Sequence, residues 1–318
     1  MRATEDRPLS GMNRSVDIFR TQELAAERFD HPPGHTHTDP VEEFSAAYSV
    51  NLVQRGDFSI QIGRRTWDVE PGVLFLTVPG MVYRCRHRDA FPVDRCLGVV
   101  YAPGNETWGT ARLDRIARRG PTARVTNRIA YLFRSIPCLS SNVDARMAVE
   151  NSAAELLDEV CREDAPHCKL YKEHQLSWYA ERVDAARVLL EMQYATAFSI
   201  SDLARAVGMS TFHFARIFRE LAGMPPHRYL LQVRMIEAAR RLQQGASVTV
   251  ACFAVGFHEL GHFSRYFRHW FGVSPSKYRP DRPSMLVAKG RSSRPLENIS
   301  FWSLSSSFSS SSSRTNRH

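Results

Sequence analysis

Two arginines near the C-terminus, Arg216 and Arg265, stand at the same position in two copies of a repeated segment. On an α-helix, residues three or four positions apart share a face, because one turn takes about 3.6 residues. That period places each arginine opposite the apolar residues of its own copy, so both side chains are expected to point away from the core. An outward guanidinium can donate two parallel hydrogen bonds to guanine O6 and N7 in the major groove of DNA. The spacing therefore predicts a matched pair of base-reading side chains.

The repeat extends well beyond the arginines. Three further pairs lie 49 residues apart, namely Gly223 with Gly272, Pro226 with Pro275, and Tyr229 with Tyr278. Upstream, Gly208 and Gly256 lie 48 residues apart. Each copy has the pattern of a helix, a turn that contains glycine, and a second helix, which is typical of a helix-turn-helix. Two tandem copies predict that one subunit contacts two successive segments of the major groove.

The second helix of the first copy is expected to run from about Ser210 to Leu221. Its predicted packing face consists of Phe214, Ile217, Phe218 and Leu221. Phe212 falls on the other side, beside the arginines, where an exposed ring suits contact with thymine methyl groups. The alternative interpretation is that Phe212 fills a gap against another part of the protein. Ser210 is expected at the N-cap, where its hydroxyl and the backbone N–H groups can meet a phosphate.

The second helix of the second copy is expected from about Glu259 to Phe271. Its predicted packing face consists of Phe263, Tyr266, Phe267, Trp270 and Phe271, and its outward face of Gly261, His262, Arg265, Arg268 and His269. Between the copies, an unbroken helix is expected from Pro225 to about Gln243, and eighteen helical residues span roughly 27 Å. That spacer suits two recognition helices about one DNA turn, roughly 34 Å, apart. The residues predicted to contact DNA are Ser210, Thr211, Phe212, His213, Arg216, Arg219, Gly261, His262, Ser264, Arg265 and Arg268.

Residues 178–279 resemble the DNA-binding domain of the AraC/XylS family of transcription regulators. The motifs that carry the resemblance are Leu203–Ala204, Gly208–Ser210 and Arg216–Phe218 in the first copy, and Ala254–Phe257, His262–Arg268 and Phe271–Arg279 in the second. The resemblance implies that Phe212, Arg216, His262 and Arg265 face DNA. The chain departs from the family pattern at Val250 and Cys252, where the family often has an acidic residue and then a small one.

Positive charge collects where the repeat lies. Residues 176–280 carry 13 Lys and Arg against 7 Asp and Glu, whereas residues 1–175 carry 23 against 24. A basic domain favours polyanions such as nucleic acid, although a solvated basic surface is the alternative interpretation. The six cysteines show no CxxC pair, which favours reduced thiols. With no signal peptide and no apolar run near the roughly 20 residues that span a bilayer, the sequence predicts a cytoplasmic protein without membrane contact.

The rest of the chain predicts an α+β protein. Short strands between Gly and Pro turns in residues 16–104 suggest a small barrel or jelly roll, and residues 111–163 have helical periodicity. Residues 16–104 resemble the cupin-like sensor domain often found ahead of AraC-type DNA-binding domains. We therefore expect a sensor and dimerisation domain over 16–165, an all-α DNA-binding domain with two helix-turn-helix units over 176–280, and a disordered Ser-rich tail over 281–318.

The N-terminal domain contains candidates for a small-molecule site. His35 and His37, followed by Glu42, have the residue types of a metal site, but a cupin of this kind needs a later histidine where Tyr83 stands. We therefore predict no metal and no cofactor, and take His35, His37, Tyr83 and His87 as candidates for an effector pocket. The two histidines at 35 and 37 could instead lie in a loop or at the mouth of the pocket. The cluster His167, Cys168 and His174 is interpreted as a linker.

These features together predict a sequence-specific transcription regulator that is not an enzyme, since no P-loop, G-x-S-x-G or G-x-G-x-x-G motif is present. Its expected partners are double-stranded DNA, an unknown small-molecule effector, a second copy of the chain in a homodimer, and RNA polymerase. Two alternatives remain open at this point: a cupin metalloenzyme fused to a DNA-binding domain, and a regulator that needs no ligand. An activator is the working hypothesis.

Overall fold

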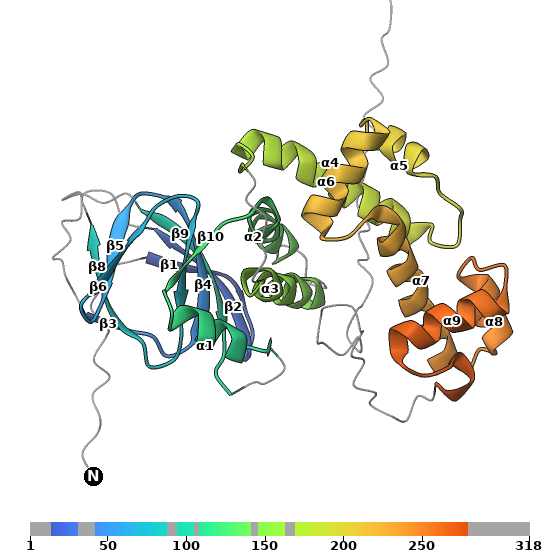
Figure 1. Cartoon of the computed structure of the whole chain (residues 1–318), viewed down its shortest axis with the longest axis horizontal. Helices are drawn as coiled ribbons and strands as arrows, with labels where there is room; N and C mark the ends of the chain where they lie inside the picture. The colour runs from blue at the N-terminus through green and yellow to red at the C-terminus, as the bar shows by residue number, and fades with distance from the viewer. Residues whose placement is uncertain are drawn as a thin grey trace, which may run out of the picture.

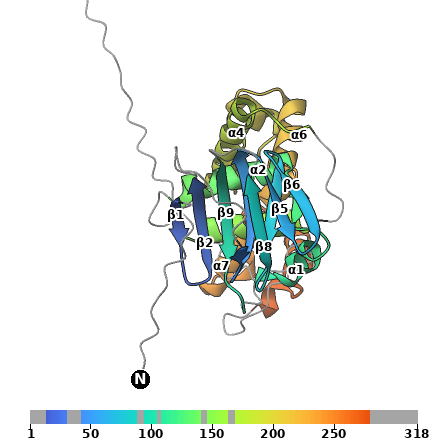
Figure 2. The same ribbon diagram turned by 90° about the vertical axis from the view of Figure 1, so that its left-hand side faces the viewer.

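The structure is a computed structural model that describes residues 14–30, 42–87, 94–104, 108–140, 146–162 and 169–278. In the residues described, the N-terminal half contains two sheets and three helices (Figures 1 and 2). The strands are β1 (Arg14–Arg20), β2 (Leu24–Asp30), β3 (Glu42–Phe44), β4 (Tyr48–Arg55), β5 (Phe58–Ile62), β6 (Arg65–Val69), β7 (Val73–Thr77), β8 (Val82–His87), β9 (Arg95–Tyr101) and β10 (Thr122–Arg124). The helices of this half are α1 (Ala111–Ala117), α2 (Asn127–Ser140) and α3 (Arg146–Val160).

The strands form two antiparallel sheets, one in the order β1-β2-β9-β4-β7-β10 and the other in the order β3-β8-β5-β6. Side chains of successive residues in a strand point to opposite faces. Accordingly, Val50, Leu74 and Val99 face the helices, whereas Val53 and Phe75 pack against the four-stranded sheet. The six-stranded sheet is therefore the middle of three layers. The expected closed barrel is not seen among the described strands, because β1 and β10 end one sheet and β3 and β6 end the other.

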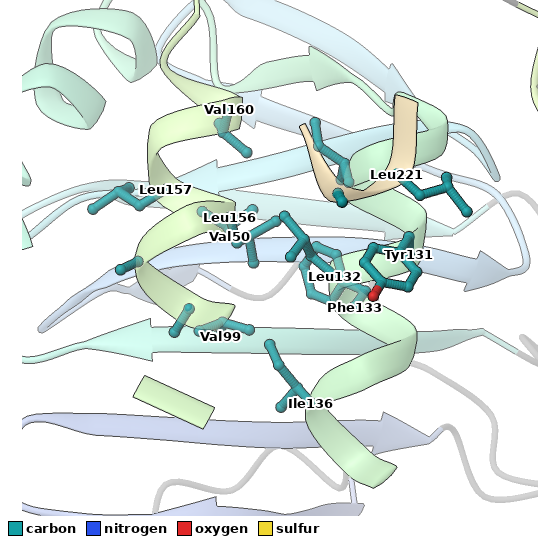
Figure 3. Packing of buried hydrophobic residues seen from close by; sticks show 14 of the residues in the cluster. Val50, Val99, Tyr131, Leu132, Phe133, Ile136, Leu156, Leu157, Val160 and Leu221 are labelled. Atoms are coloured by element: carbon teal, nitrogen blue, oxygen red, sulfur yellow. The ribbon is translucent and has the colours of Figure 1, made fainter. Parts of the chain in front are cut away.

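Helices α2 and α3 cover the outer face of the six-stranded sheet. Figure 3 shows Leu156 of α3 beside Val50 and Ile136 of α2 toward Val99, and all four side chains are buried in one cluster. Burying each side chain of this size stabilises the fold by about 1.5–3 kcal/mol. The two helices thereby cover one side of the N-terminal domain, and α2 also contacts the C-terminal half.

Two details differ from the helical interpretation of residues 111–163. Residues Thr122–Arg124 form strand β10, which pairs with β7 at the edge of the sheet, because long-range pairing overrides a weak local pattern. Pro137 lies inside α2, although proline more often stands at a helix boundary. Since Pro137 stands only one turn before the helix ends at Ser140, the missing backbone donor affects the last turn alone.

The C-terminal half is helical throughout the residues that the structure describes. Its helices are α4 (Glu173–Met192), α5 (Ile200–Ala206), α6 (Thr211–Ala222), α7 (Pro226–Gln243), α8 (Val248–Ala254) and α9 (Leu260–Phe271), followed by the short 3-10 turn η2 (Pro275–Lys277). The expected helices at 210–221, 225–243 and 259–271 are confirmed to within two residues. His174, expected in a linker, lies in the first turn of α4. His167, Cys168 and the Ser-rich tail lie outside the described residues.

Two separate hydrophobic clusters divide the C-terminal half. The first runs from Leu24 of the sheet through α2 and α3 to Ala222 of α6, so the first helix-turn-helix shares its core with the N-terminal domain. The second runs from Met235 of α7 to Tyr278 and contains the second helix-turn-helix together with the C-terminal part of α7. Figure 1 shows this arrangement, with α4 to α6 near α2 and with α8 and α9 at the far end of α7.

Candidate nucleic-acid interface

The two helix-turn-helix units are built from matching local signals. Ser199 and Ser247 stand at the N-caps of α5 and α8, where each hydroxyl accepts a backbone hydrogen bond from the residue three positions on. This is the side-chain capping that satisfies the first orphan N–H groups of a helix. The turns then need a left-handed residue, and Gly208 and Gly256 supply it with φ of 68° and 79°. The repeat in the sequence is thus a repeat in structure.

Helix α6 has one buried face and one exposed face. Phe214, Ile217, Phe218 and Leu221 are buried, which confirms the predicted packing face. Arg216 and Arg219 are exposed, and Phe212 is 84% exposed. Within the described part of the chain Phe212 therefore fills no gap, which removes the alternative interpretation of that ring. The outward side of α6 is an apolar ring beside two guanidinium groups.

Helix α9 repeats this division. Its buried residues are Phe263, Phe267 and Phe271, with Tyr266 and Trp270 half-buried beside them. The predicted outward residues are all exposed, namely Gly261, His262, Arg265, Arg268 and His269. The imidazole of His262 stands edge-on to Tyr266, with 4.8 Å between the ring centroids. Arg216 and Arg265 occupy equivalent outward positions, because each stands five residues after the first residue of its helix.

The remaining predicted contact residues are placed less uniformly. Ser210 is the N-cap of α6 and Thr211 is exposed in its first turn. Ser264 is half-buried on α9. The ring of His213 lies 5.4 Å from that of Tyr179 on α4, and its Nε2 atom is buried. His213 thus sits apart from the exposed group that surrounds Arg216.

Arg216 lies against two acceptors that periodicity did not indicate. Its Nη1 atom donates to the Tyr171 hydroxyl over 3.4 Å and lies 3.7 Å from the Glu220 carboxylate. Tyr171 donates in turn to Glu220 at 2.6 Å, and the amide of Asn127 donates to the same carboxylate at 2.7 Å. Burial, together with Glu220, raises the pKa of Tyr171 to about 12, so its hydroxyl stays a donor at neutral pH. In the described residues no hydrogen bond or ion pair engages the side chain of Arg265.

The sequence offered only a partial signal for this contact. Glu220 stands four residues after Arg216, the spacing at which helical side chains form ion pairs. Tyr171 and Asn127 are 45 and 89 positions away from Arg216, so no local pattern connects them with it. Asn127 is the first residue of α2, and its side-chain oxygen accepts from the Tyr171 backbone N–H at 2.8 Å. A polar chain therefore leads from the N-terminal domain to a predicted base-reading residue.

The C-terminal end of α6 docks on the N-terminal domain through Arg128 of α2. The Nη1 atom of Arg128 donates to the Leu221 carbonyl at 2.8 Å, and the same guanidinium pairs with Glu155 and Glu159 of α3. A cation at a helix C-terminus is favourable because the last carbonyls carry partial negative charge. Gly223 ends α6 in a left-handed conformation, and a Cβ there would lie 2.4 Å from the guanidinium carbon. The positive φ of 76° favours glycine at this position, and a side chain there would also displace the Arg128 guanidinium.

The candidate effector residues fall on one strand. Tyr83 and His87 of β8 point into the layer between the sheets, whereas Arg84 and Arg86 are exposed on the other face. The Tyr83 hydroxyl donates to Glu43 at 3.0 Å, and burial raises its pKa. His87 Nε2 lies 2.9 Å from the Asp94 carboxylate, and both side chains are buried. His35 and His37 lie outside the described residues.

Metal-ligating side chains do not gather in the described part of the chain: no three of its His, Cys, Asp and Glu residues come together. Cys96, Cys138, Cys161 and Cys252 form no disulfide. None of the described helices has the length and apolar character that crossing a membrane requires.

Comparison with known proteins decides the family of the C-terminal region. A family described as a helix-turn-helix domain matches residues 203–281, the span that holds both units with their exposed arginines. The C-terminal region is an AraC-type helix-turn-helix domain. This AraC-type domain departs from the usual pattern at Val250 and Cys252, which both lie on α8. Cys252 is fully buried, whereas Val250 is 56% exposed.

Individual relatives agree with this assignment. An uncharacterized HTH-type transcriptional regulator of Haemophilus influenzae is 35% identical over 100 residues, which are 31% of this chain and 34% of that protein. The uncharacterized HTH-type transcriptional regulator YbfI of Bacillus subtilis is 23% identical over 69% of this chain and 79% of its own length. The first of these matches thus spans about a third of that relative's length.

Among solved structures, a probable AraC family transcriptional regulator from Rhodopseudomonas palustris CGA009 is similar to this chain. It is 30% identical, with 31% of this chain and 94% of that chain covered and a TM-score of 0.29.

Proposed function

We propose that this chain is a sequence-specific, effector-responsive transcription regulator whose two helix-turn-helix units read successive segments of the major groove. One observation carries the proposal: α6 and α9 expose equivalent arginines on faces that the protein core leaves unused. The exposed ring of Phe212 beside Arg216 supports base contact. On one surface, the ring can contact a thymine methyl group and the guanidinium can bind guanine. The proposed contact residues remain the eleven residues between Ser210 and Arg268 that are named in the sequence analysis.

Binding to DNA is expected to weaken steeply as salt rises, because lysines and arginines that neutralise phosphates release condensed counterions. The full chain is used to select duplexes from a random-sequence pool, and fluorescence anisotropy then measures affinity between 50 and 200 mM salt, about the range over which such effects are large. We expect a linear fall of log affinity with log salt, and tighter binding to the selected duplex than to a scrambled one. Equal affinity for both duplexes would exclude sequence-specific recognition.

We also propose that the N-terminal domain senses a ligand and passes the signal through α2. Support comes from contacts on both sides of this helix. Arg187 of α4 donates to Tyr131 of α2 at 3.0 Å and to Tyr229 of α7 at 3.1 Å. Figure 3 places Leu221 of α6 beside Tyr131, within one hydrophobic cluster. A ligand that prefers one position of α2 would shift the arrangement of the first helix-turn-helix.

The effector is expected to be a small organic molecule bound without a tightly held metal. The layer between the sheets offers Tyr83 and His87 as polar groups for a ligand. A tight metal site usually needs at least three protein ligands, and His35 and His37 lack a further histidine because Tyr83 stands in its place. Elemental analysis of the purified protein is combined with a thermal-shift screen of small organic acids, sugars and amines. We expect a substoichiometric metal content and at least one stabilising compound whose effect is lost on Tyr83→Phe or His87→Ala. Stoichiometric metal that is lost on His35→Ala or His37→Ala would favour the cupin metalloenzyme instead.

Further partners belong to the same proposal. A homodimer is expected through the N-terminal domain, and because the apolar faces of α2 and α3 pack within the chain, it would use outward residues of these helices. A regulator of this kind acts on genomic DNA in the cytoplasm and contacts RNA polymerase there.

A further inference from the structure

The two helix-turn-helix units have separate hydrophobic cores, and the side chain of Arg234 on α7 connects the units between these cores. The first unit belongs to the cluster that ends at Ala222, and the second to the cluster that begins at Met235. Between them, the side chains of α7 change from one cluster to the other: Leu230 packs on the first and Leu231 on the second. Because the two cores lie at opposite ends of α7, contacts near the middle of this helix must set the relative orientation of the two units.

The guanidinium of Arg234 makes those contacts with backbone carbonyls of both units. Its Nε donates to the Tyr194 carbonyl at 2.7 Å and its Nη2 to the Thr196 carbonyl at 3.0 Å, in the loop that leads into α5. Its Nη1 donates to the Gly256 carbonyl at 3.3 Å, in the turn between α8 and α9. The same guanidinium lies 5.9 Å from the centre of the Phe257 ring. One half-buried side chain therefore connects the entrance of the first unit to the turn of the second.

The backbones at this junction also approach closely. A Cβ at Gly256 would lie 2.4 Å from the carbonyl oxygen of Ala195, so the second turn packs directly on the loop of the first unit. The side chain of Tyr194 adds a further tie, since its hydroxyl accepts from Arg241 at 3.1 Å and donates to Glu237 at 3.3 Å, both on α7. Although burial acts in the opposite direction, Arg240 and Arg241 hold the pKa of Glu237 below its usual value, so this tie includes a carboxylate.

We propose that Arg234 is a specificity-determining residue that fixes the spacing and angle between the two recognition helices, and thereby the spacing of the DNA boxes that the protein accepts. The inference rests on the proposed DNA-binding function. Arg234 does this by holding the two units together, because three of its five N–H donors are used on backbone carbonyls of both units. Inserting one base pair between two boxes moves the second box by about 3.4 Å and turns it by roughly 35°. A rigid pair of helices cannot follow that change, whereas a loosened pair can.

The test compares wild type with Arg234→Met, which keeps an apolar stem and removes every donor. The probes are the duplex selected by the wild-type full chain and two versions with one base pair inserted or deleted between the boxes. We expect wild type to lose about tenfold or more in affinity on either altered duplex, the equivalent of one lost set of base contacts. We expect Arg234→Met to lose about threefold or less on the same change. Arg228→Met is the matched control, since Arg228 is exposed on the same helix, and its ratio between duplexes should equal that of wild type.

Each outcome has one meaning. If wild type binds no duplex specifically, the proposed DNA-binding function is wrong, and that result is distinct from a failure of the inference about Arg234. If wild type prefers one spacing and Arg234→Met keeps the full ratio, or loses affinity equally on all three duplexes, Arg234 is only a stabilising residue and the inference is wrong. Arg234→Lys is measured in parallel, because it retains the charge and one donor group, and a partly relaxed ratio is expected from it. A Lys variant that folds and keeps the wild-type ratio would overturn the inference even if the Met variant does not fold.

Discussion

Phe267→Ala is expected to unfold the second helix-turn-helix while the first unit and the N-terminal domain stay folded. Phe267 is fully buried, and its ring centroid lies 4.5 Å from that of Phe271, 5.3 Å from Tyr278 and 5.7 Å from Phe263. Truncating such a residue costs about 3–5 kcal/mol through lost burial and the cavity left behind. Because the second core is a separate cluster of modest size, a loss of this magnitude exceeds what its few side chains can offset.

Hydrogen exchange followed by mass spectrometry checks this expectation. Peptides from residues 248–278 should lose protection in Phe267→Ala, while those from residues 127–160 and 200–222 should keep it. Phe212→Ala is the matched control, because this ring is 84% exposed and its removal should change the free energy of unfolding by only about 0.5 kcal/mol or less. Equal loss of protection in all these segments would mean that the two cores unfold as one.

Arg265→Ala is expected to weaken binding to the selected duplex by about 1–3 kcal/mol and to remove the preference for one base pair in the second box. Arg216→Ala should do the same in the first box, but with a smaller net loss. The reason for the asymmetry is that Arg216 already contacts Tyr171 and Glu220, and these contacts are given up when the guanidinium turns to a base. An exposed ion pair of this kind is worth about 0–1 kcal/mol.

The measurement is the affinity of each variant for a panel of duplexes that differ at single base pairs. Arg205→Ala serves as the control, since Arg205 is an exposed arginine of the same domain that pairs with Asp202 on α5. It should leave the base preferences unchanged. Wild-type affinities and preferences in both Arg216→Ala and Arg265→Ala would rule out these helices as the reading elements.

Local periodicity was sufficient to predict the two reading helices and their faces. The apolar positions of α6 and α9 recur with the helical period, and their glycine turns and C-terminal glycines recur with the repeat. These features depend on residues at most a few positions apart, so the sequence contains them directly. The exposed side of each helix, with Arg216 and Arg265, followed from the same reasoning.

The strand pattern predicted less of the fold than the helical period did. The sequence indicated short strands in residues 16–104, but it did not indicate that β2 and β4 pair with β9 or that two sheets stay separate. It also missed β10, whose three residues are held by β7 rather than by their own propensity. Strand partners are chosen by contacts between distant segments, which local alternation does not specify.

By itself the sequence determined the tandem helix-turn-helix, its outward arginines and its basic charge, because each depends on short-range spacing or composition. Only the tertiary structure decided that the first unit shares a core with α2 whereas the second has its own. The same holds for the contacts of Arg216 with Tyr171 and of Arg234 with the Gly256 carbonyl. Such contacts join residues 22 to 45 positions apart, and the chain brings them together only by burying apolar faces that lie elsewhere in the fold.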